Sequence, residues 1–187
     1  WASAARTPRY VYDLNSALVA REKLGEMSHI LAASGAEQVD ILAHSMGTFL
    51  TMEGLVEAQQ RGTLGKRNRI NTIMLASPDI DIDLFKSQLT QLKYGKDKIY
   101  VLVSKDDSAL RVSRILSGGV DRTGQANAEE VAALGVNVID LSKIDDSSAG
   151  SHSKFAGSPE VVQLIGRGLN SNPGALEGDA KPLASFL

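Results

Sequence analysis

The sequence contains no cysteine among its 187 residues. Disulfide bonds, thiolate metal sites and a cysteine nucleophile are therefore excluded. No apolar run approaches the about 20 residues that a transmembrane helix needs, so we expect no integral membrane segment in this chain. Neither sign of charge dominates, because 20 basic residues stand against 22 acidic ones. Such a balance creates no long-range field for nucleic acid or an anionic membrane, and we expect neither as a partner.

The remaining composition is that of an ordinary globular protein, with 43% hydrophobic and 22% charged residues. A chain of this length fits one domain of moderate size or part of a larger one. It begins at Trp1 without an initiator methionine, which we interpret as the start of a fragment or a processed product. The lack of a signal peptide therefore does not locate the protein in a compartment.

Short apolar segments alternate with helix-like segments along most of the chain. Strands are predicted over residues 39–43, 70–76, 99–104 and 136–141, and helices over residues 9–34, 47–60, 83–94 and 109–116, with a last helix from Pro159. This alternation predicts an α/β fold with a mostly parallel sheet and helices on both faces. We predict one domain over residues 1–169. Glycine, proline and asparagine dominate residues 170–187, which we expect to form a loose tail.

Several local expectations follow from the same pattern. Apolar positions recur at helical spacing over residues 9–34, which predicts a broad apolar helix face. The run over residues 39–43 is typical of a strand buried on both faces. Asp83 is placed to cap the helix that follows it, and Ser158 to cap the helix that starts at Pro159.

Three residue types needed for acyl transfer follow predicted strands. Ser45, Asp107 and His152 come after the first, third and fourth strand, and so are expected on one rim of the sheet. Serine acyl transfer requires an exposed hydroxyl, an imidazole that takes its proton and a carboxylate that orients the imidazole. The chain order Ser, Asp, His is the order associated with α/β hydrolases.

The segment Ala43-His44-Ser45-Met46-Gly47 predicts a sharp turn from a strand into a helix. We expect small residues at its ends because side chains two positions either side of the serine nearly collide. The helix N-terminus faces the reacting carbonyl, and the backbone N–H of Met46 can donate to an oxyanion. His44 is expected to pack, or to contact substrate at the rim, without taking part in the chemistry.

Plainer interpretations stay open for these residues. Ser45 can be a helix cap, and Asp106 and Asp107 can form a solvated turn. His29 lies inside the first predicted helix, where a surface or partly buried role is expected. The acidic run within residues 78–83 lacks the glycine and glutamate positions of an EF-hand, so we interpret it as a strand-end loop rather than a calcium site.

Four stretches make the chain similar to a known family: VDILAHSMGTFLTMEGL, IMLASPDID, YVLVSKDDSALRVSR and IDLSKIDDSSAGSHSKF. The sequence resembles an esterase/lipase-like family of bacterial α/β hydrolases of unknown function, from Trp1 to about Leu169. The resemblance implies Ser45 as nucleophile, His152 as base and Asp107 as acid, with Asp106 as a neighbour or cap. It implies no metal or organic cofactor.

The turn at Ser45 and the order of the acid and the base, together with the resemblance, lead us to expect a serine hydrolase that cleaves small-molecule carboxylic esters through an acyl-enzyme. Two departures accompany it: Ala43 replaces a glycine, and the family's oxyanion loop and early strands are expected before Trp1. The loss of one oxyanion donor costs a factor of about 10²–10³ in rate. Two alternatives stay open: an impaired scaffold that acts as a binding or structural module, and an acyltransferase with the same triad. Asp145 and Asp146 also match the family, and we expect them to brace the histidine loop.

Overall fold

The computed structural model describes residues 1–4, 6–64, 70–93, 95–144 and 151–170. The strands are β1 (Val39–His44), β2 (Ile70–Ala76), β3 (Ile99–Val103) and β4 (Asn137–Asp140). The helices are α1 (Tyr10–Ala33), α2 (Met46–Gln60), α3 (Ile82–Gln91), α4 (Ser108–Leu116), α5 (Ala128–Ala132), α6 (Lys154–Gly157) and α7 (Pro159–Asn170). Single 3₁₀ turns lie at Thr7–Arg9, Lys96–Lys98, Thr123–Gln125 and Ser151–Ser153.

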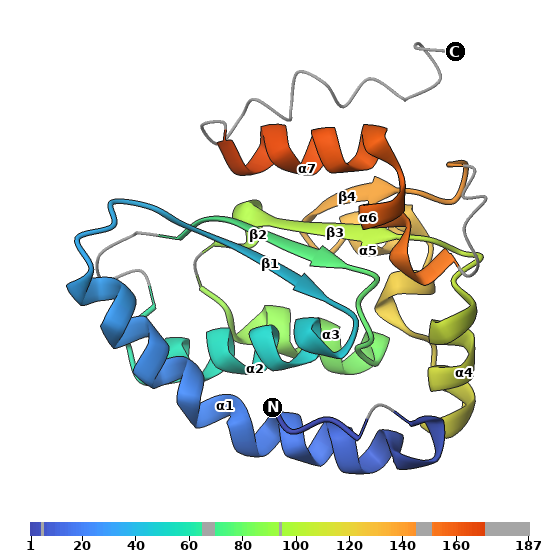
Figure 1. The fold of residues 1–187 in the computed structure, drawn as a ribbon, viewed down its shortest axis with the longest axis horizontal. Coiled ribbons are helices and arrows are strands. Elements are labelled where there is room, and N and C mark those ends of the chain that lie inside the picture. Colours follow the sequence, from blue (N-terminus) through green and yellow to red (C-terminus); the bar gives the residue numbers. More distant parts are fainter. Residues whose placement is uncertain (5, 65–69, 94, 145–150, 171–187) are drawn as a thin grey trace.

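The four strands form one sheet in the order β1-β2-β3-β4, and every neighbouring pair is parallel. Helices α1, α2 and α3 lie on one side of the sheet, and α6 and α7 lie on the other (Figure 1). The prediction of a parallel sheet with helices on both faces is confirmed. No helix within the described residues is long and apolar enough to cross a bilayer.

Two apolar clusters hold the layers together, one on each face of the sheet. Because side chains alternate along a strand, β2 serves both clusters. Ile73 and Leu75 pack in the cluster with α2 and α3, whereas Met74 packs on the opposite face with Val161 of α7. The sheet is thus held from both sides at its centre, which fixes where its carboxyl ends lie.

The prediction that β1 is buried on both faces is wrong. Asp40 and Leu42 are exposed, and 45% of Leu42 is open to solvent. Among the described residues β1 is an edge strand, and the α7-side cluster contains residues of β2, β3 and β4 but none of β1. One face of β1 is therefore left uncovered at Leu42.

The broad apolar face predicted for the first helix is also not buried as a unit. Only Asp13 and Ala17 of α1 are buried, while Val19 is 81% and Ile30 68% exposed. The apolar residues of α1 lie on more than one side of the helix. Packing against α2 therefore covers only part of them.

Capping at the strand ends partly differs from the prediction. Asp81, and not Asp83, caps α3: its Oδ1 accepts hydrogen bonds from the N–H groups of Asp83 and Leu84 at 2.9 and 3.2 Å. Asp81 has the non-helical backbone that an N-cap requires, and the helix starts one residue earlier than expected. Ser158 does act as predicted, because its Oγ accepts from the N–H of Val161. Of the tail expected over 170–187, residues 171–187 lie outside the described residues.

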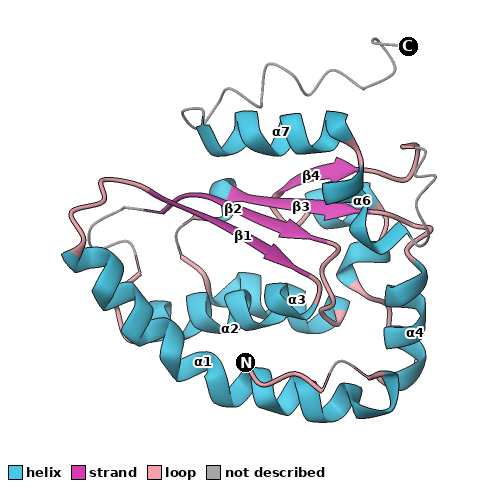
Figure 2. Cartoon of the chain, viewed as in Figure 1, coloured by secondary structure: helices cyan, strands magenta, loops and turns pink. Residues whose placement is uncertain are grey.

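The loops at the carboxyl ends of the strands meet on one rim (Figure 2). Gly124, in the turn between α4 and α5, packs against the loop after β2, and its N–H donates to the Pro78 carbonyl at 3.0 Å. A Cβ at Gly124 would come within 2.8 Å of Pro78 N and 2.9 Å of Ser77 C. Only a residue without a side chain allows this approach of two backbones.

We expect Gly124→Ala to lower the free energy of unfolding by about 1–3 kcal/mol, because the added methyl group meets backbone that cannot move aside. Chemical denaturation measures the change. Gly166→Ala is the matched control, since an added Cβ there meets nothing within 4 Å, and we expect no loss of stability. Equal stability of the two variants would contradict the close approach.

Candidate active site

Three strands end in serines that lie next to one another in space. Ser45 donates its N–H to Ala76 O, Ser77 to Leu102 O and Ser104 to Gly124 O, at 3.0, 3.2 and 2.7 Å. The first two bonds continue the parallel ladders β1–β2 and β2–β3 by one residue, whereas the third joins β3 to the 3₁₀ turn Thr123–Gln125. The rim is therefore a continuous hydrogen-bonded edge, and the loops that leave it are fixed relative to one another.

Ser45 has a strained backbone, with φ 55° and ψ −128°. Among the described residues only Ser45 and Ser77 combine a side chain with positive φ. Such a conformation costs about 1–3 kcal/mol and persists only where the surroundings hold it. The Ser45 side chain makes no capping hydrogen bond with α2. The helix-cap alternative therefore does not describe this side chain.

The backbone carbonyl of Ser45 is held from two sides. Thr48 donates to it through N–H at 3.0 Å and through Oγ1 at 2.6 Å, and the N–H of Asp79 approaches at 3.4 Å. Met46 is the first residue of α2, so its N–H is one of those without an acceptor inside the helix. These contacts fix the turn while the Ser45 hydroxyl plays no part in them.

Asp107 and His152, far apart in the sequence, are in contact. His152 Nδ1–H donates to both Asp107 oxygens, at 2.8 Å to Oδ2 and 3.0 Å to Oδ1. Asp107 is fully buried, and its Oδ1 also accepts from the N–H of Leu110, which caps α4. Burial alone would raise the pKa of Asp107, but hydrogen bonds from His152 and Leu110 outweigh it and hold that pKa below its ordinary value.

The backbone of His152 is fixed by two residues at the ends of β1 and β2. His44 Nε2 lies 3.0 Å from the His152 carbonyl oxygen, and Ser77 Oγ donates to the same oxygen at 3.3 Å. Burial lowers the pKa of His44, which favours the neutral imidazole with Nε2–H as donor. The His44 ring also lies 4.7 Å from the His152 ring and 4.6 Å from that of Phe155. His44 thus packs against the histidine loop, one of its two expected roles.

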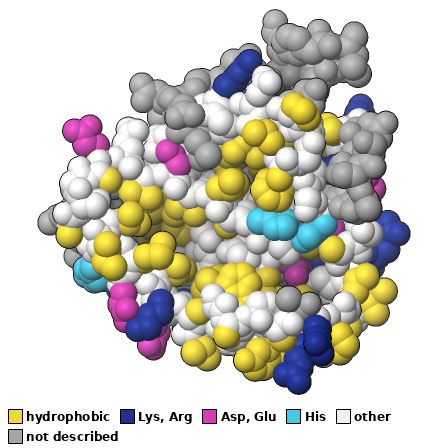
Figure 3. All heavy atoms as spheres, viewed as in Figure 1, with side chains coloured by type: hydrophobic (Ala, Val, Ile, Leu, Met, Phe, Trp, Pro, Cys, Tyr) yellow, Lys and Arg dark blue, Asp and Glu magenta, His cyan; other side chains and the backbone are white. Residues whose placement is uncertain are grey.

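Figure 3 shows two adjoining histidine side chains on this face, beside a hollow with apolar side chains around it. His152 keeps 21% of its side chain accessible, whereas its partner Asp107 has none. In such an arrangement the carboxylate holds one ring nitrogen, here Nδ1, and leaves the other, Nε2, on the accessible side of the ring.

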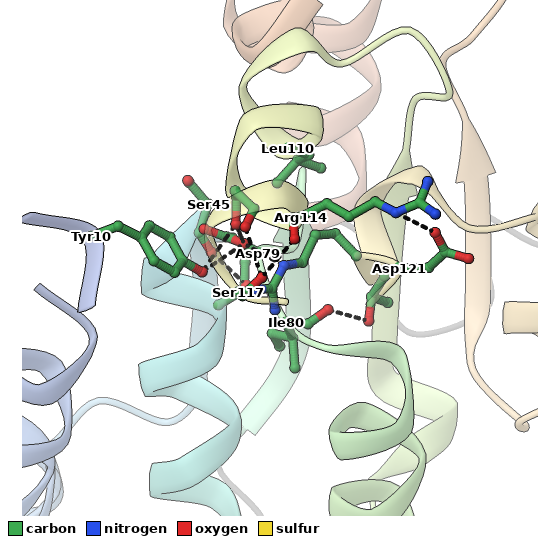
Figure 4. Close-up of polar contacts among 12 residues, drawn as sticks. Tyr10, Ser45, Asp79, Ile80, Leu110, Arg114, Ser117 and Asp121 are labelled. Atoms are coloured by element: carbon green, nitrogen blue, oxygen red, sulfur yellow. Dashed lines mark hydrogen bonds and ion pairs between the residues drawn. The ribbon is translucent and has the colours of Figure 1, made fainter. Parts of the chain in front are cut away.

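A buried ionic cluster lies behind the Ser45 turn (Figure 4). The Asp79 carboxylate accepts from Ser113 Oγ at 2.5 Å and from Tyr10 O–H at 3.1 Å, and Arg122 Nε lies 3.4 Å away. Arg122 also donates to Ser117, the residue that follows α4. Burial, and next the Asp79 charge, raise the pKa of Tyr10, so the phenol stays protonated as a donor. The cluster joins α1, α4 and the loop after β2.

Asp106, next to Asp107 in sequence, faces a different partner. Both of its oxygens accept from Lys154 Nζ, at 2.9 and 2.7 Å, and its Oδ1 also accepts from Ser104 Oγ. Burial would raise the pKa of Asp106, but the Lys154 and Ser104 hydrogen bonds hold it below its ordinary value. Asp106 is therefore a neighbour of the site; the cap of α4 is Asp107. Neither carboxylate belongs to a merely solvated turn.

For the remaining residues named in the sequence analysis, the structure corrects one expectation. Ala43 is buried at the end of β1, but a Cβ at Gly47 would meet only the Trp1 ring at 3.9 Å. The expected near-collision between these two positions is therefore wrong, because α2 carries Gly47 away from the strand. His29 is exposed on α1. Asp145 and Asp146 lie outside the described residues.

Sequence reasoning did not identify Tyr10, Arg122 or Lys154. None of them belongs to a local motif, and each contacts the site across a long stretch of sequence. Asp79 belongs to the acidic run over residues 78–83, which carries no local sign that this carboxylate is buried. No group of three or more potential metal ligands occurs in the described part of the chain.

We expect Arg122→Met to lower the free energy of unfolding by about 3–5 kcal/mol, because it leaves the buried Asp79 carboxylate without its cation. Urea denaturation measures the change. Arg114→Met is the control: Arg114 pairs with Asp121 at 3.1 Å, but both side chains are about half exposed. An exposed pair contributes at most about 1 kcal/mol. Equal losses in both variants would show that Asp79 does not need Arg122.

The lowered pKa of Asp107 makes stability depend on pH. A carboxyl group whose folded pKa lies below its unfolded value of about 3.9 adds stability above that pH, and this is lost as pH falls through the folded value. We therefore expect the unfolding free energy to fall more steeply below about pH 4 in the native chain than in Asp107→Asn, by denaturation across pH 3–7. Asp83→Asn, at a side chain 81% exposed, is the control. Identical acid profiles for Asp107→Asn and the native chain would contradict the assignment.

Comparison with known proteins agrees with the fold. No curated protein and no solved structure matches the chain. The family model described as an alpha/beta hydrolase of unknown function (DUF900) matches residues 1–168, which is most of the chain and includes every residue of the site described above. The chain therefore belongs to this family of alpha/beta hydrolases.

Proposed function

We propose that the protein is a serine hydrolase that cleaves small-molecule carboxylic esters through an acyl-enzyme. Ser45 is the nucleophile, His152 the general base and Asp107 the carboxylate that orients His152. The observation that carries the proposal is the pairing of His152 Nδ1–H with a fully buried Asp107 at 2.8 Å. This bond selects the tautomer in which Nε2 can accept a proton.

The strained turn at Ser45 supports the nucleophile assignment. A serine held at positive φ between a strand and a helix presents its hydroxyl at the rim of the sheet, as in the nucleophile elbow of α/β hydrolases. The N-terminus of α2 follows immediately. Negative charge that develops on a bound carbonyl is stabilised there by the helix dipole and by the Met46 N–H.

The reaction proceeds in two halves. Ser45 Oγ attacks the ester carbonyl while His152 Nε2 takes the hydroxyl proton, and the tetrahedral oxyanion accepts a hydrogen bond from Met46 N–H. The intermediate collapses as the C–O bond to the alcohol breaks, and His152 gives the proton to the leaving alcohol. Water then attacks the acyl-Ser45 carbonyl while His152 takes its proton; the bond to Ser45 Oγ breaks, His152 returns the proton to Oγ, and the free acid leaves. Asp107 stays ionised and stabilises the imidazolium.

The hydrolase chemistry is tested by labelling with a fluorophosphonate probe, followed by peptide mapping. We expect label at Ser45 and none at Ser77, the other serine with positive φ. Ser45→Ala abolishes labelling and lowers kcat on a p-nitrophenyl ester by about 10⁶, because the triad acts as a unit. Ser87→Ala, on an exposed position of α3, is the matched control and keeps both activities. Unchanged turnover in a folded Ser45→Ala protein would overturn the proposal.

A further inference from the structure

Two adjacent carboxylates of the loop after β3 contact the histidine loop at two points. Asp107 binds the His152 imidazole, and Asp106 binds the Lys154 ammonium two residues further on. The two contacts are equally short, at 2.8 Å for Asp107 and 2.7 Å for Asp106. Asp106–Lys154 therefore runs beside the Asp107–His152 pair, between the same two segments of chain.

The Lys154 ammonium is fixed in place more firmly than a surface lysine. Its side chain is only 3% exposed, while that of Asp106 is 54% exposed. A buried ammonium is destabilising unless a carboxylate and further acceptors surround it. Nζ meets this need with both Asp106 oxygens and, at 3.4 Å, the Leu141 carbonyl just after β4. Lys154 thereby ties the start of α6 to the ends of two strands.

The acceptor is held as well. Ser104, the first residue after β3, donates through Oγ to Asp106 Oδ1. Ser104 is itself fixed, because its N–H bonds the Gly124 carbonyl at 2.7 Å. Asp106 therefore has a set orientation despite its exposure. The ion pair is anchored to the rim at one end and to the histidine loop at the other.

We propose that the Asp106–Lys154 ion pair is a positioning device that sets the orientation of the His152 imidazole toward Asp107 and the Ser45 turn. The Asp107 bond holds the His152 imidazole, and the contacts from His44 and Ser77 hold its carbonyl oxygen, so all three act at one residue and leave the direction of the chain beyond it unset. A second attachment two residues away sets this direction. The effect that we expect on turnover rests on the proposed function. The effect that we expect on the Asp107–His152 hydrogen bond does not.

Two variants test the pair, and a third is their control. Asp106→Asn removes the acceptor charge and leaves the buried Lys154 unpaired. Lys154→Met removes the ammonium but keeps an apolar stem, so this variant folds even if the Asp106→Asn protein does not. Glu130→Gln is the matched control, because Glu130 is 52% exposed and pairs with Lys86 Nζ at 2.9 Å, away from the rim. We expect both test variants to lower kcat on p-nitrophenyl acetate by about tenfold with KM nearly unchanged, since small misplacement costs up to about 10² in rate. Glu130→Gln keeps the native values.

A spectroscopic readout separates this role from the proposed chemistry. The Nδ1–H proton of His152 bonded to Asp107 is expected as a low-field proton NMR signal, assigned by its loss in His152→Ala. We expect the signal in the native chain, in Glu130→Gln and in Asp106→Glu, which keeps the carboxylate. Broadening or loss in folded Lys154→Met or Asp106→Asn supports the inference.

The two proposals fail in different ways. A native signal in folded Lys154→Met, with native kcat, would overturn the positioning role and leave the hydrolase proposal standing. Absence of fluorophosphonate labelling in the native chain would overturn the hydrolase proposal, whereas a signal that depends on Lys154 would still support the positioning role.

Discussion

The hydrogen bond between the buried Asp107 carboxylate and the His152 imidazole is the contact on which the candidate site depends. It joins the loop after β3 to the segment after β4, and the same carboxylate starts α4. A carboxylate without exposure stays ionised only where donors surround it, and here a ring N–H and a backbone N–H supply them. Burial makes this bond strong, and the parallel sheet makes it possible by placing both loops on one rim.

Around that bond, most contacts of the site hold backbone carbonyl groups in place. His44 and Ser77 hold the carbonyl of His152, and Thr48 and Asp79 hold that of Ser45. The Asp79–Arg122 pair lies behind the second set and reaches α1 through Tyr10. The positive φ of Ser45 is therefore maintained by contacts from elements that are widely separated in the sequence.

The fold was largely predictable because its signals are local. Apolar runs of strand length alternate with helical segments, and a serine, an aspartate and a histidine each follow a strand. The predictions that were wrong concern contacts with neighbouring elements. Leu42 is apolar yet exposed, since no described helix covers it. The cap of α3 is Asp81 instead of Asp83, because either aspartate suits the local pattern. Lys154 and Arg122 could not be identified, because a buried cation is recognised only once its distant partner is known.

Asp107 and Ser45 differ in how far the fold depends on their side chains. Asp107 supports both a helix terminus and the imidazole, so its loss affects folding as well as any chemistry. The Ser45 hydroxyl makes no cap, and its turn is held by backbone contacts. A lineage that lost selection for activity could therefore replace the hydroxyl while keeping the fold. The fold thus depends on position 107 whether or not the site is active, whereas nothing in the described part of the fold depends on the hydroxyl at position 45.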